Sequence, residues 1–173
     1  MKGTPESPVL IRADAGGRLG IGHVTRMIAL AQAISGLGGQ AVLVCPTCPG
    51  GFELRITGEG IRFQRVEGEP GSDEDLANTL ELARAHGASW MVVDGYHFLE
   101  NYQRAVRSAG HKLMCVDDYG HCGVWHADAI LNHNLYAPER TFIASVPDAA
   151  ILAGPRYALL RKEFLNAPST SAP

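Results

Sequence analysis

The sequence has no long hydrophobic run, no excess of positive charge and few cysteines. No apolar stretch approaches the about 20 residues that a membrane-spanning helix needs, and residues 1–14 contain no apolar signal segment. Lysine and arginine number 15 against 18 acidic residues, so no basic surface field is expected to attract a nucleic acid backbone. We therefore expect a cytoplasmic protein that binds neither membranes nor nucleic acid.

The cysteines exclude one class of small protein. Cys45, Cys48, Cys115 and Cys122 are too few for a disulfide framework at this length and fit a reducing compartment. Cys45 and Cys48 have the spacing of a redox motif, and Cys122 with His126 could add zinc ligands. The second pair lacks zinc-knuckle spacing, and Pro-Gly-Gly after Cys48 is a poor helix start for activating a thiol. We expect no metal and no cofactor, with a redox or zinc site as the minor alternative.

Short apolar runs alternate with amphipathic stretches along the chain, and turn-forming residues separate them. The pattern predicts strands at 7–14, 40–45, 61–66, 89–94, 111–118, 129–132 and 149–154, and helices at 23–39, 50–60, 73–87, 98–110 and 157–164. Ser72 is the expected N-cap of the clearest helix, with Asp75 at the capping-box position. This alternation predicts one α/β domain with a doubly wound, Rossmann-like parallel sheet, which binds ligands at the carboxyl ends of its strands.

A glycine-rich turn, RADAGGRLGIGH, joins the first strand to the first helix. Such a turn lets backbone N–H groups approach a ligand at a helix start. It lacks the Lys-Ser/Thr of a phosphate loop. The match of Gly20 and Gly22 to a dinucleotide fingerprint fails at Thr25 and at Cys45, where an acidic residue would hold a ribose. Nucleotide hydrolases of the phosphate-loop type and nicotinamide enzymes are therefore disfavoured.

His23 closes this turn at or near the helix start. The positive end of the helix dipole disfavours an imidazolium there, and a neutral imidazole is a competent general base. The alternative is a polar helix cap or a satisfied, half-buried side chain. The glycines on one side and the aspartate-ended strands on the other favour catalysis.

Several predicted strands end in aspartate, at Asp14, Asp94, Asp117 and Asp118. Carboxylates in such places often cap the next helix or pin a loop, so a structural role is the more frequent one for any single member. Asp14 is the best functional candidate, because it shares the glycine turn with His23. Arg12 is expected to pair with a carboxylate rather than to bind a substrate.

Five segments resemble, in order and in approximate spacing, the nucleotide-sugar hydrolases of pseudaminic acid biosynthesis and the related spore-coat polysaccharide proteins. They are IRADAGGRLGIGHVTRMIALAQAI, VVDGYHF, CVDDYGH, ADAILNHNLYA and LAGPRYALLRKEF. The resemblance runs from Val9 to Phe164 and implies the N-terminal half of a GT-B-type architecture, two Rossmann-like domains facing across a cleft. It implies water attack at the anomeric carbon of a UDP-linked 2,4-diacetamido-2,4,6-trideoxyhexose, with inversion and release of UDP.

The same resemblance assigns roles to residues. His23 is the base that activates water, and Tyr96 lines the sugar pocket. The family more often has Asp-His-Tyr where this chain has Asp94-Gly95-Tyr96, which leaves the role of His97 open. Asn132 and Asn134 match an asparagine pair that either bonds the acetamido groups or satisfies turn backbone. The expected substrate-binding residues are Asp14, Gly20, Gly22, Tyr96, Asn132 and Asn134.

In the family the polypeptide continues past LLRKEF into a domain that binds the nucleotide. We therefore expect a Rossmann-like domain at 1–164, a disordered tail at 165–173, and no C-terminal nucleotide-binding domain in this sequence. The expected substrate is a UDP-linked amino sugar, and a separate C-terminal domain is the expected partner, without which hydrolysis is weak. Two alternatives stay open: the acceptor-side domain of a GT-B glycosyltransferase, and a half that binds sugar without catalysis.

Overall fold

The computed structural model describes residues 7–14, 21–46 and 51–165. In these residues seven parallel strands form one sheet in the order β3-β2-β1-β4-β5-β6-β7. The strands are β1 (Val9–Ala13), β2 (Ala41–Cys45), β3 (Arg62–Arg65), β4 (Trp90–Asp94), β5 (Lys112–Val116), β6 (Ala129–Asn132) and β7 (Ala150–Ala153). Strands are added outward from β1 on one side and from β4 on the other, which is the doubly wound order. The predicted Rossmann-like parallel sheet is confirmed.

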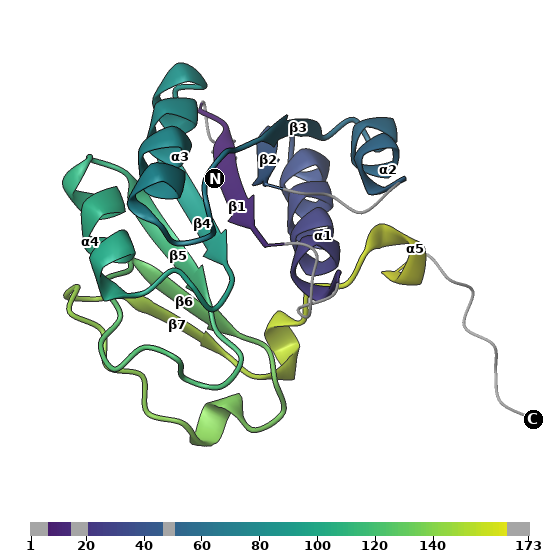
Figure 1. Ribbon diagram of the computed structural model, residues 1–173. Coiled ribbons are helices and arrows are strands. Elements are labelled where there is room, and N and C mark those ends of the chain that lie inside the picture. The colour runs from purple at the N-terminus through teal and green to yellow at the C-terminus, as the bar shows by residue number, and fades with distance from the viewer. Residues whose placement is uncertain (1–6, 15–20, 47–50, 166–173) are drawn as a thin grey trace, which may run out of the picture.

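Helices cover both faces of the sheet (Figure 1). One face carries α1 (Gly22–Gly36), α2 (Phe52–Gly58) and α5 (Lys162–Leu165), and the other carries α3 (Asp73–Ala85) and α4 (Glu100–Ser108). Short 3-10 turns span Ala137–Glu139 and Pro155–Tyr157. Each face has its own hydrophobic core, and neighbouring β1 residues contribute to opposite cores, Leu10 to the α3 side and Ile11 to the α1 side.

The apolar stripe predicted for the first helix is the one that α1 buries. Val24, Met27, Ile28 and Ala31 are all inaccessible to solvent, and Ile34 packs partly against the same core. Burying such side chains contributes roughly 1.5–3 kcal/mol for each large one. Packing against β1 and β2 therefore fixes the position of the first turn of α1.

The start of α3 also agrees with the sequence. Ser72 has extended backbone angles, and its Oγ accepts a hydrogen bond from the Asp75 amide at 3.1 Å. Leu76, Leu80 and Ala83 face the core on this side of the sheet. The capping residue and the buried stripe of this helix are both confirmed.

The predicted last helix at 157–164 is wrong. After the 3-10 turn, residues 158–161 are not helical, and α5 takes in Leu165, which the sequence assigned to the tail. Tyr157, at the end of the 3-10 turn, and Leu159 both pack on the α1-side core. A helix this short has little stability of its own, so this packing prevails. Residues 166–173, the rest of the predicted tail, lie outside the described residues.

No helix within the described ranges has the length and apolar character to cross a lipid bilayer.

Candidate functional site

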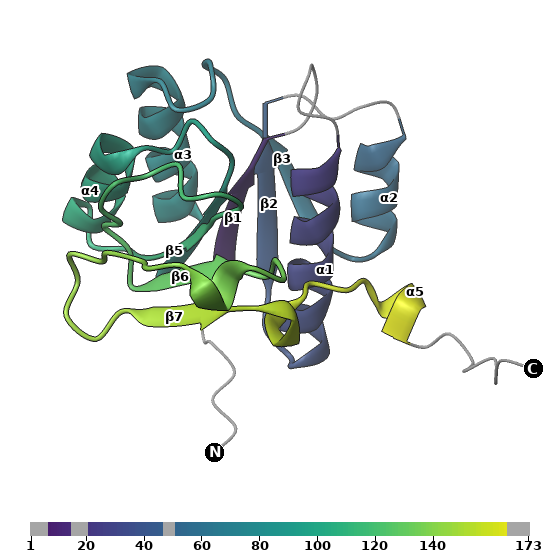
Figure 2. The ribbon, with the colours of Figure 1, turned by 90° about the horizontal axis from the view of Figure 1, so that it is seen from below.

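The candidate site lies at the carboxyl edge of the sheet, where β1 and β4 diverge. The chain leaves β1 toward β2 and β4 toward β5, so the helices that follow these strands cover opposite faces. Figure 2 shows the start of α1 at the same edge as the carboxyl end of β1. Side chains from the end of β4 and from the turns after β4, β5 and β6 converge there on the first turns of α1.

His23 is the second residue of α1, as predicted for a helix start. Its ring is enclosed, with 6% of the residue exposed, and it meets the Tyr96 ring edge-on at a centroid distance of 4.9 Å. Nε2 lies 3.9 Å from Asp118 Oδ2. Nδ1 is buried and has no hydrogen-bond partner among the described residues. The two ring nitrogens therefore have different surroundings.

Arg26, one turn further along α1, joins the ends of two strands. Its Nε and Nη2 donate to the two oxygens of Asp94 at 2.6 and 2.5 Å, and its Nη1 donates to Asp118 Oδ1 at 2.6 Å. Burial would lower the pKa of Arg26, but the two carboxylates outweigh this and raise it. The guanidinium is thus a permanent cation that links α1 to β4 and to the turn after β5.

Asp118 is the most connected carboxylate of the site. Besides the Arg26 contacts, its Oδ2 accepts a hydrogen bond from the Tyr96 hydroxyl at 3.0 Å. Burial alone would raise the pKa of Asp118, but the hydrogen bonds and charge of Arg26, with help from Tyr96 and Asn134, lower it to about 2. Asp118 is therefore an anion at neutral pH, beside the imidazole of His23.

The asparagine pair after β6 holds the turn that carries Asp118. Asn132 Nδ2 donates to Asp117 Oδ2 at 2.9 Å and to the Asp118 carbonyl at 3.2 Å. Asn134 Nδ2 donates to the same carbonyl at 3.2 Å and to Asn132 Oδ1 at 2.9 Å. These contacts are those of the turn-satisfying alternative, and they position Asp118 through its backbone.

Asp117 anchors the next part of this loop. It accepts a hydrogen bond from the Gly120 amide at 2.7 Å and lies 3.2 Å from His121 Nδ1. Burial would lower the pKa of His121, but Asp117 and Cys122 outweigh it and raise the pKa to about 9. The Tyr119 ring, half exposed, lies 5.0 Å from that of Tyr96. The loop after β5 thus places an aromatic ring beside Tyr96, which packs against His23.

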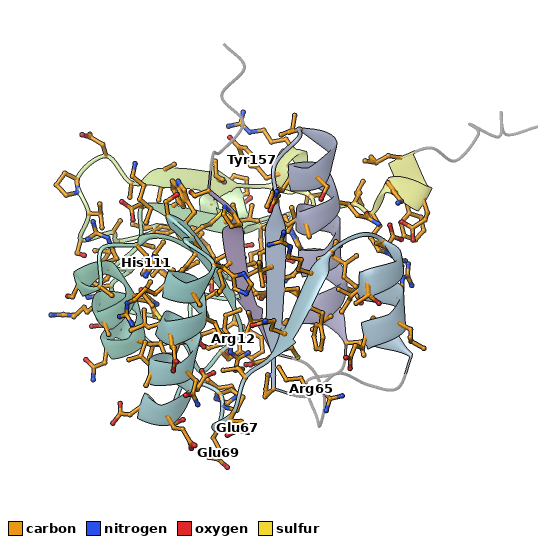
Figure 3. All side chains as sticks on the ribbon, turned by 90° about the horizontal axis from the view of Figure 1, so that it is seen from above. Arg12, Arg65, Glu67, Glu69, His111 and Tyr157 are labelled. Carbon is orange, nitrogen blue, oxygen red and sulfur yellow. The ribbon has the colours of Figure 1, made fainter. Side chains whose placement is uncertain are left out.

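The Asp14 carboxylate pairs with Arg12, which the sequence predicted to bind a carboxylate. Arg12 is fully buried and donates to Asp75 at 2.8 Å and to Asp14 at 3.0 Å, between β1 and α3 (Figure 3). Burial raises the pKa of Asp14, although the Arg12 guanidinium opposes this shift. A Cβ at Gly95 would collide with Asp14 Oδ2, so any other residue there would displace the Asp14 carboxylate.

The structure therefore brings together His23, Tyr96, Asn132 and Asn134 around Asp118. The Asp14 carboxylate instead pairs with Arg12. Gly22 is the first residue of α1, and Gly20 lies outside the described residues. Arg26 is the functional candidate that sequence reasoning missed. Its signal was present, because Arg26 is the single Lys, Arg, Asp or Glu residue of the helix Gly22–Gly36.

The described residues include three of the four cysteines. No three His, Cys, Asp or Glu side chains gather there as metal ligands would. Cys115 and Cys122 are buried free thiols, and Cys45 is buried. Cys48, the other half of the candidate redox pair, lies outside the described residues.

Comparison with known proteins supports the expected resemblance. No protein-family model matches the chain. The chain is 25% identical over 158 residues to the UDP-2,4-diacetamido-2,4,6-trideoxy-beta-L-altropyranose hydrolase of Campylobacter jejuni, covering 90% of this chain and 53% of that protein. It therefore spans about half the length of this curated relative.

Solved structures resemble the fold. A glycosyltransferase from Rickettsia africae superposes with a TM-score of 0.50 at 10% identity, over 65% of this chain and 30% of that one. MurG of Acinetobacter baumannii gives a TM-score of 0.49 at 15% identity, over 73% and 41% of the two chains. The Rickettsia superposition agrees with the predicted Rossmann-like α/β class, and it concerns the fold alone. The chain is similar in sequence to a nucleotide-sugar hydrolase, as its motifs indicated.

Proposed function

We propose that this chain is the domain of a nucleotide-sugar hydrolase that supplies the general base, His23. The observation that carries the proposal is the position of His23 in the first turn of α1, at the sheet's switch point and 3.9 Å from the Asp118 carboxylate. The similarity to the Campylobacter hydrolase over 90% of the chain supports the same reaction class.

The proposed reaction is water attack at the anomeric carbon of a UDP-linked 2,4-diacetamido-2,4,6-trideoxyhexose. The water oxygen forms a bond to the anomeric carbon, and the bond from that carbon to the UDP oxygen breaks with its electron pair remaining on UDP. His23 accepts the proton that the attacking water loses. Attack opposite the leaving group inverts the configuration of the anomeric carbon.

The His23 side chain is 8% exposed, and the proposed role requires the water held by the substrate to reach that exposed part of the ring. Tyr96 packs against the ring and forms the wall of the proposed sugar pocket. Since its hydroxyl is bonded to Asp118, Tyr96 offers the sugar mainly its ring. Asp14, Gly20, Gly22, Asn132 and Asn134 remain proposed substrate contacts, with the asparagines acting at least partly through the turn that they hold.

We further propose that residues 1–164 form one domain of a two-domain, GT-B-type enzyme and that UDP binds mainly to the other domain. The coverage of 53% of the Campylobacter hydrolase supports this division. The separate nucleotide-binding domain is the partner that the proposed reaction requires.

The experiment measures UDP release from the UDP-linked diacetamido sugar, with no acceptor alcohol added. The enzyme is a fusion of this chain to the part of the Campylobacter hydrolase that it does not match. The wild-type fusion should release UDP, and His23→Asn should lower kcat by about 10²–10⁴-fold.

His86→Asn is the matched control, because His86 follows α3 at the opposite edge of the sheet, and it should leave kcat unchanged. Equal rates for His23→Asn and wild type would reject the base. Release that requires an acceptor alcohol would favour a glycosyltransferase, and sugar binding without release would favour a non-catalytic half.

A further inference from the structure

We propose that His133 is a substrate-binding residue whose imidazole forms a hydrogen bond with an acetamido or hydroxyl group of the sugar. The inference rests on the proposed function and adds to it a residue that sets the affinity for the sugar. It follows from the place of His133 in the site, from its unused hydrogen-bonding capacity and from the charges around it.

The turn after β6 fixes the position of His133. Asn132 Oδ1 accepts a hydrogen bond from the Asn134 amide at 3.1 Å, which closes a turn with His133 at its centre. The side-chain amides of both asparagines donate to the Asp118 carbonyl at 3.2 Å. His133 therefore follows β6 at the carboxyl edge of the sheet, where sheets of this type bind ligands.

The imidazole of His133 has no partner for its polar atoms. The residue is half-buried, and neither ring nitrogen forms a hydrogen bond within residues 7–14, 21–46 and 51–165. Nδ1 is buried, whereas Nε2 is not enclosed in this way. Half-buried polar groups ordinarily find a partner, because leaving one unpaired costs free energy. Nε2 is the atom that a ligand can reach and pair.

The neighbouring polar side chains are already bonded to one another. Arg26 donates to Asp94 and to Asp118, both at 2.6 Å. The Tyr96 hydroxyl donates to Asp118 at 3.0 Å. A sugar oxygen that took a hydrogen bond from Arg26 or Tyr96 would have to displace a carboxylate. His133 can bind the sugar without breaking any of these contacts.

The charges near His133 favour a neutral group of the substrate. Burial and the Arg26 guanidinium lower the pKa of His133, and Asp118 and Asp94 oppose this shift. The ring is therefore neutral at neutral pH, with one nitrogen that donates and one that accepts. The adjacent ion pairs join one cation to two carboxylates, and their excess negative charge repels a diphosphate. An amide or hydroxyl group of the sugar is the part of the substrate that suits this ring.

The first test measures binding without turnover, in the fusion enzyme that carries His23→Asn. Calorimetry with the UDP-linked diacetamido sugar gives the Kd. Adding His133→Leu should raise this Kd about tenfold, because leucine fills similar space without a polar atom. His133→Gln should recover part of the affinity, since its side-chain amide both donates and accepts.

His86→Leu is the matched control, because His86 is also half-buried but lies at the opposite edge of the sheet, and it should leave the Kd unchanged. An unchanged Kd in His133→Leu overturns this inference and leaves the proposed function standing. A loss in His133→Gln equal to that in His133→Leu overturns it as well. Release of UDP by the His23→Asn fusion overturns the proposed function itself.

The second test needs neither catalysis nor a folded leucine variant. The free 2,4-diacetamido-2,4,6-trideoxyhexose is titrated into the wild-type chain, and NMR follows the ring signal of His133, assigned by its loss in His133→Gln. The His133 signal should shift progressively as sugar is added, whereas the His86 signal should stay in place. A His133 signal that does not move, whatever happens at other residues, overturns the inference.

Discussion

At the scale of single residues, Arg12 is a buried cation on whose pairing the stability of the fold depends. It is fully buried between Asp75 and Asp14, and removing one partner of a buried ion pair leaves an uncompensated charge. Arg12→Met should lower the free energy of unfolding by about 3–5 kcal/mol, measured by urea denaturation. Arg84→Met, an exposed change in the last turn of α3, should cost less than about 0.5 kcal/mol. Equal losses would contradict the role given to Arg12.

We expect the free energy of unfolding to depend on pH through His121. Its pKa in the folded protein is raised to about 9 from an ordinary value of 6.5, so folding favours the protonated ring. The stability that this provides is complete below pH 6.5 and is lost as the pH rises through 9. The free energy of unfolding should therefore fall over this interval in the wild type. His121→Gln should flatten the fall, and an undiminished slope in the variant would disprove the assignment.

Sequence reasoning identified individual candidate residues better than it identified the residues that they contact. The position of His23 at a helix start was predicted, because a glycine turn before an apolar stripe marks a helix beginning. The Arg12 pairing was predicted, but Asp75 is 63 positions away, and only the packing of α3 on β1 brings the two together. Arg26 was missed because an arginine within a helix is ordinarily a solvated residue, and its carboxylate partners come from the end of β4 and from the turn after β5.

At the scale of elements, the start of α3 depends on one hydroxyl. Ser72 Oγ accepts the Asp75 amide hydrogen bond, and such a cap contributes about 1 kcal/mol. Ser72→Ala should lower the free energy of unfolding by that amount in urea denaturation, whereas Ser72→Gly should cost only a few tenths of a kcal/mol. A loss in Ser72→Ala no greater than in Ser72→Gly would show that the cap does not stabilise α3.

Elements with a strong period were predictable, and the C-terminal segment was not. The stripes of α1 and α3 and the apolar runs of β4 and β5 follow from hydrophobic spacing alone. The segment from Tyr157 to Phe164 is held by long-range contacts instead: Gln32 accepts the Lys162 amide hydrogen bond, and Arg55 pairs with Glu163. Local hydrophobic spacing does not reflect such contacts. It therefore predicted a helix where tertiary packing favours a non-helical backbone at residues 158–161.

At the scale of the whole molecule, the alternation of strands and helices fixed the fold class, because parallel strands need crossover helices and these cover both faces. The proposed division of the substrate between two domains has a thermodynamic consequence. A ligand stabilises a protein in proportion to its affinity for the folded state. About 1 mM UDP should therefore raise the Tm of this chain alone by less than about 1 °C. A rise of several degrees would place the nucleotide site in this domain and contradict the division.

The central claim is that His23 deprotonates a water molecule that attacks the anomeric carbon, and the position of the water oxygen in the products tests it most directly. The fusion enzyme would turn over the UDP-linked diacetamido sugar in water enriched in heavy oxygen, and mass spectrometry would locate the label. The account predicts label in the released sugar, none in UDP, and loss of labelled sugar in His23→Asn. Label in the UDP phosphate, or labelled sugar formed equally well by His23→Asn, would contradict it.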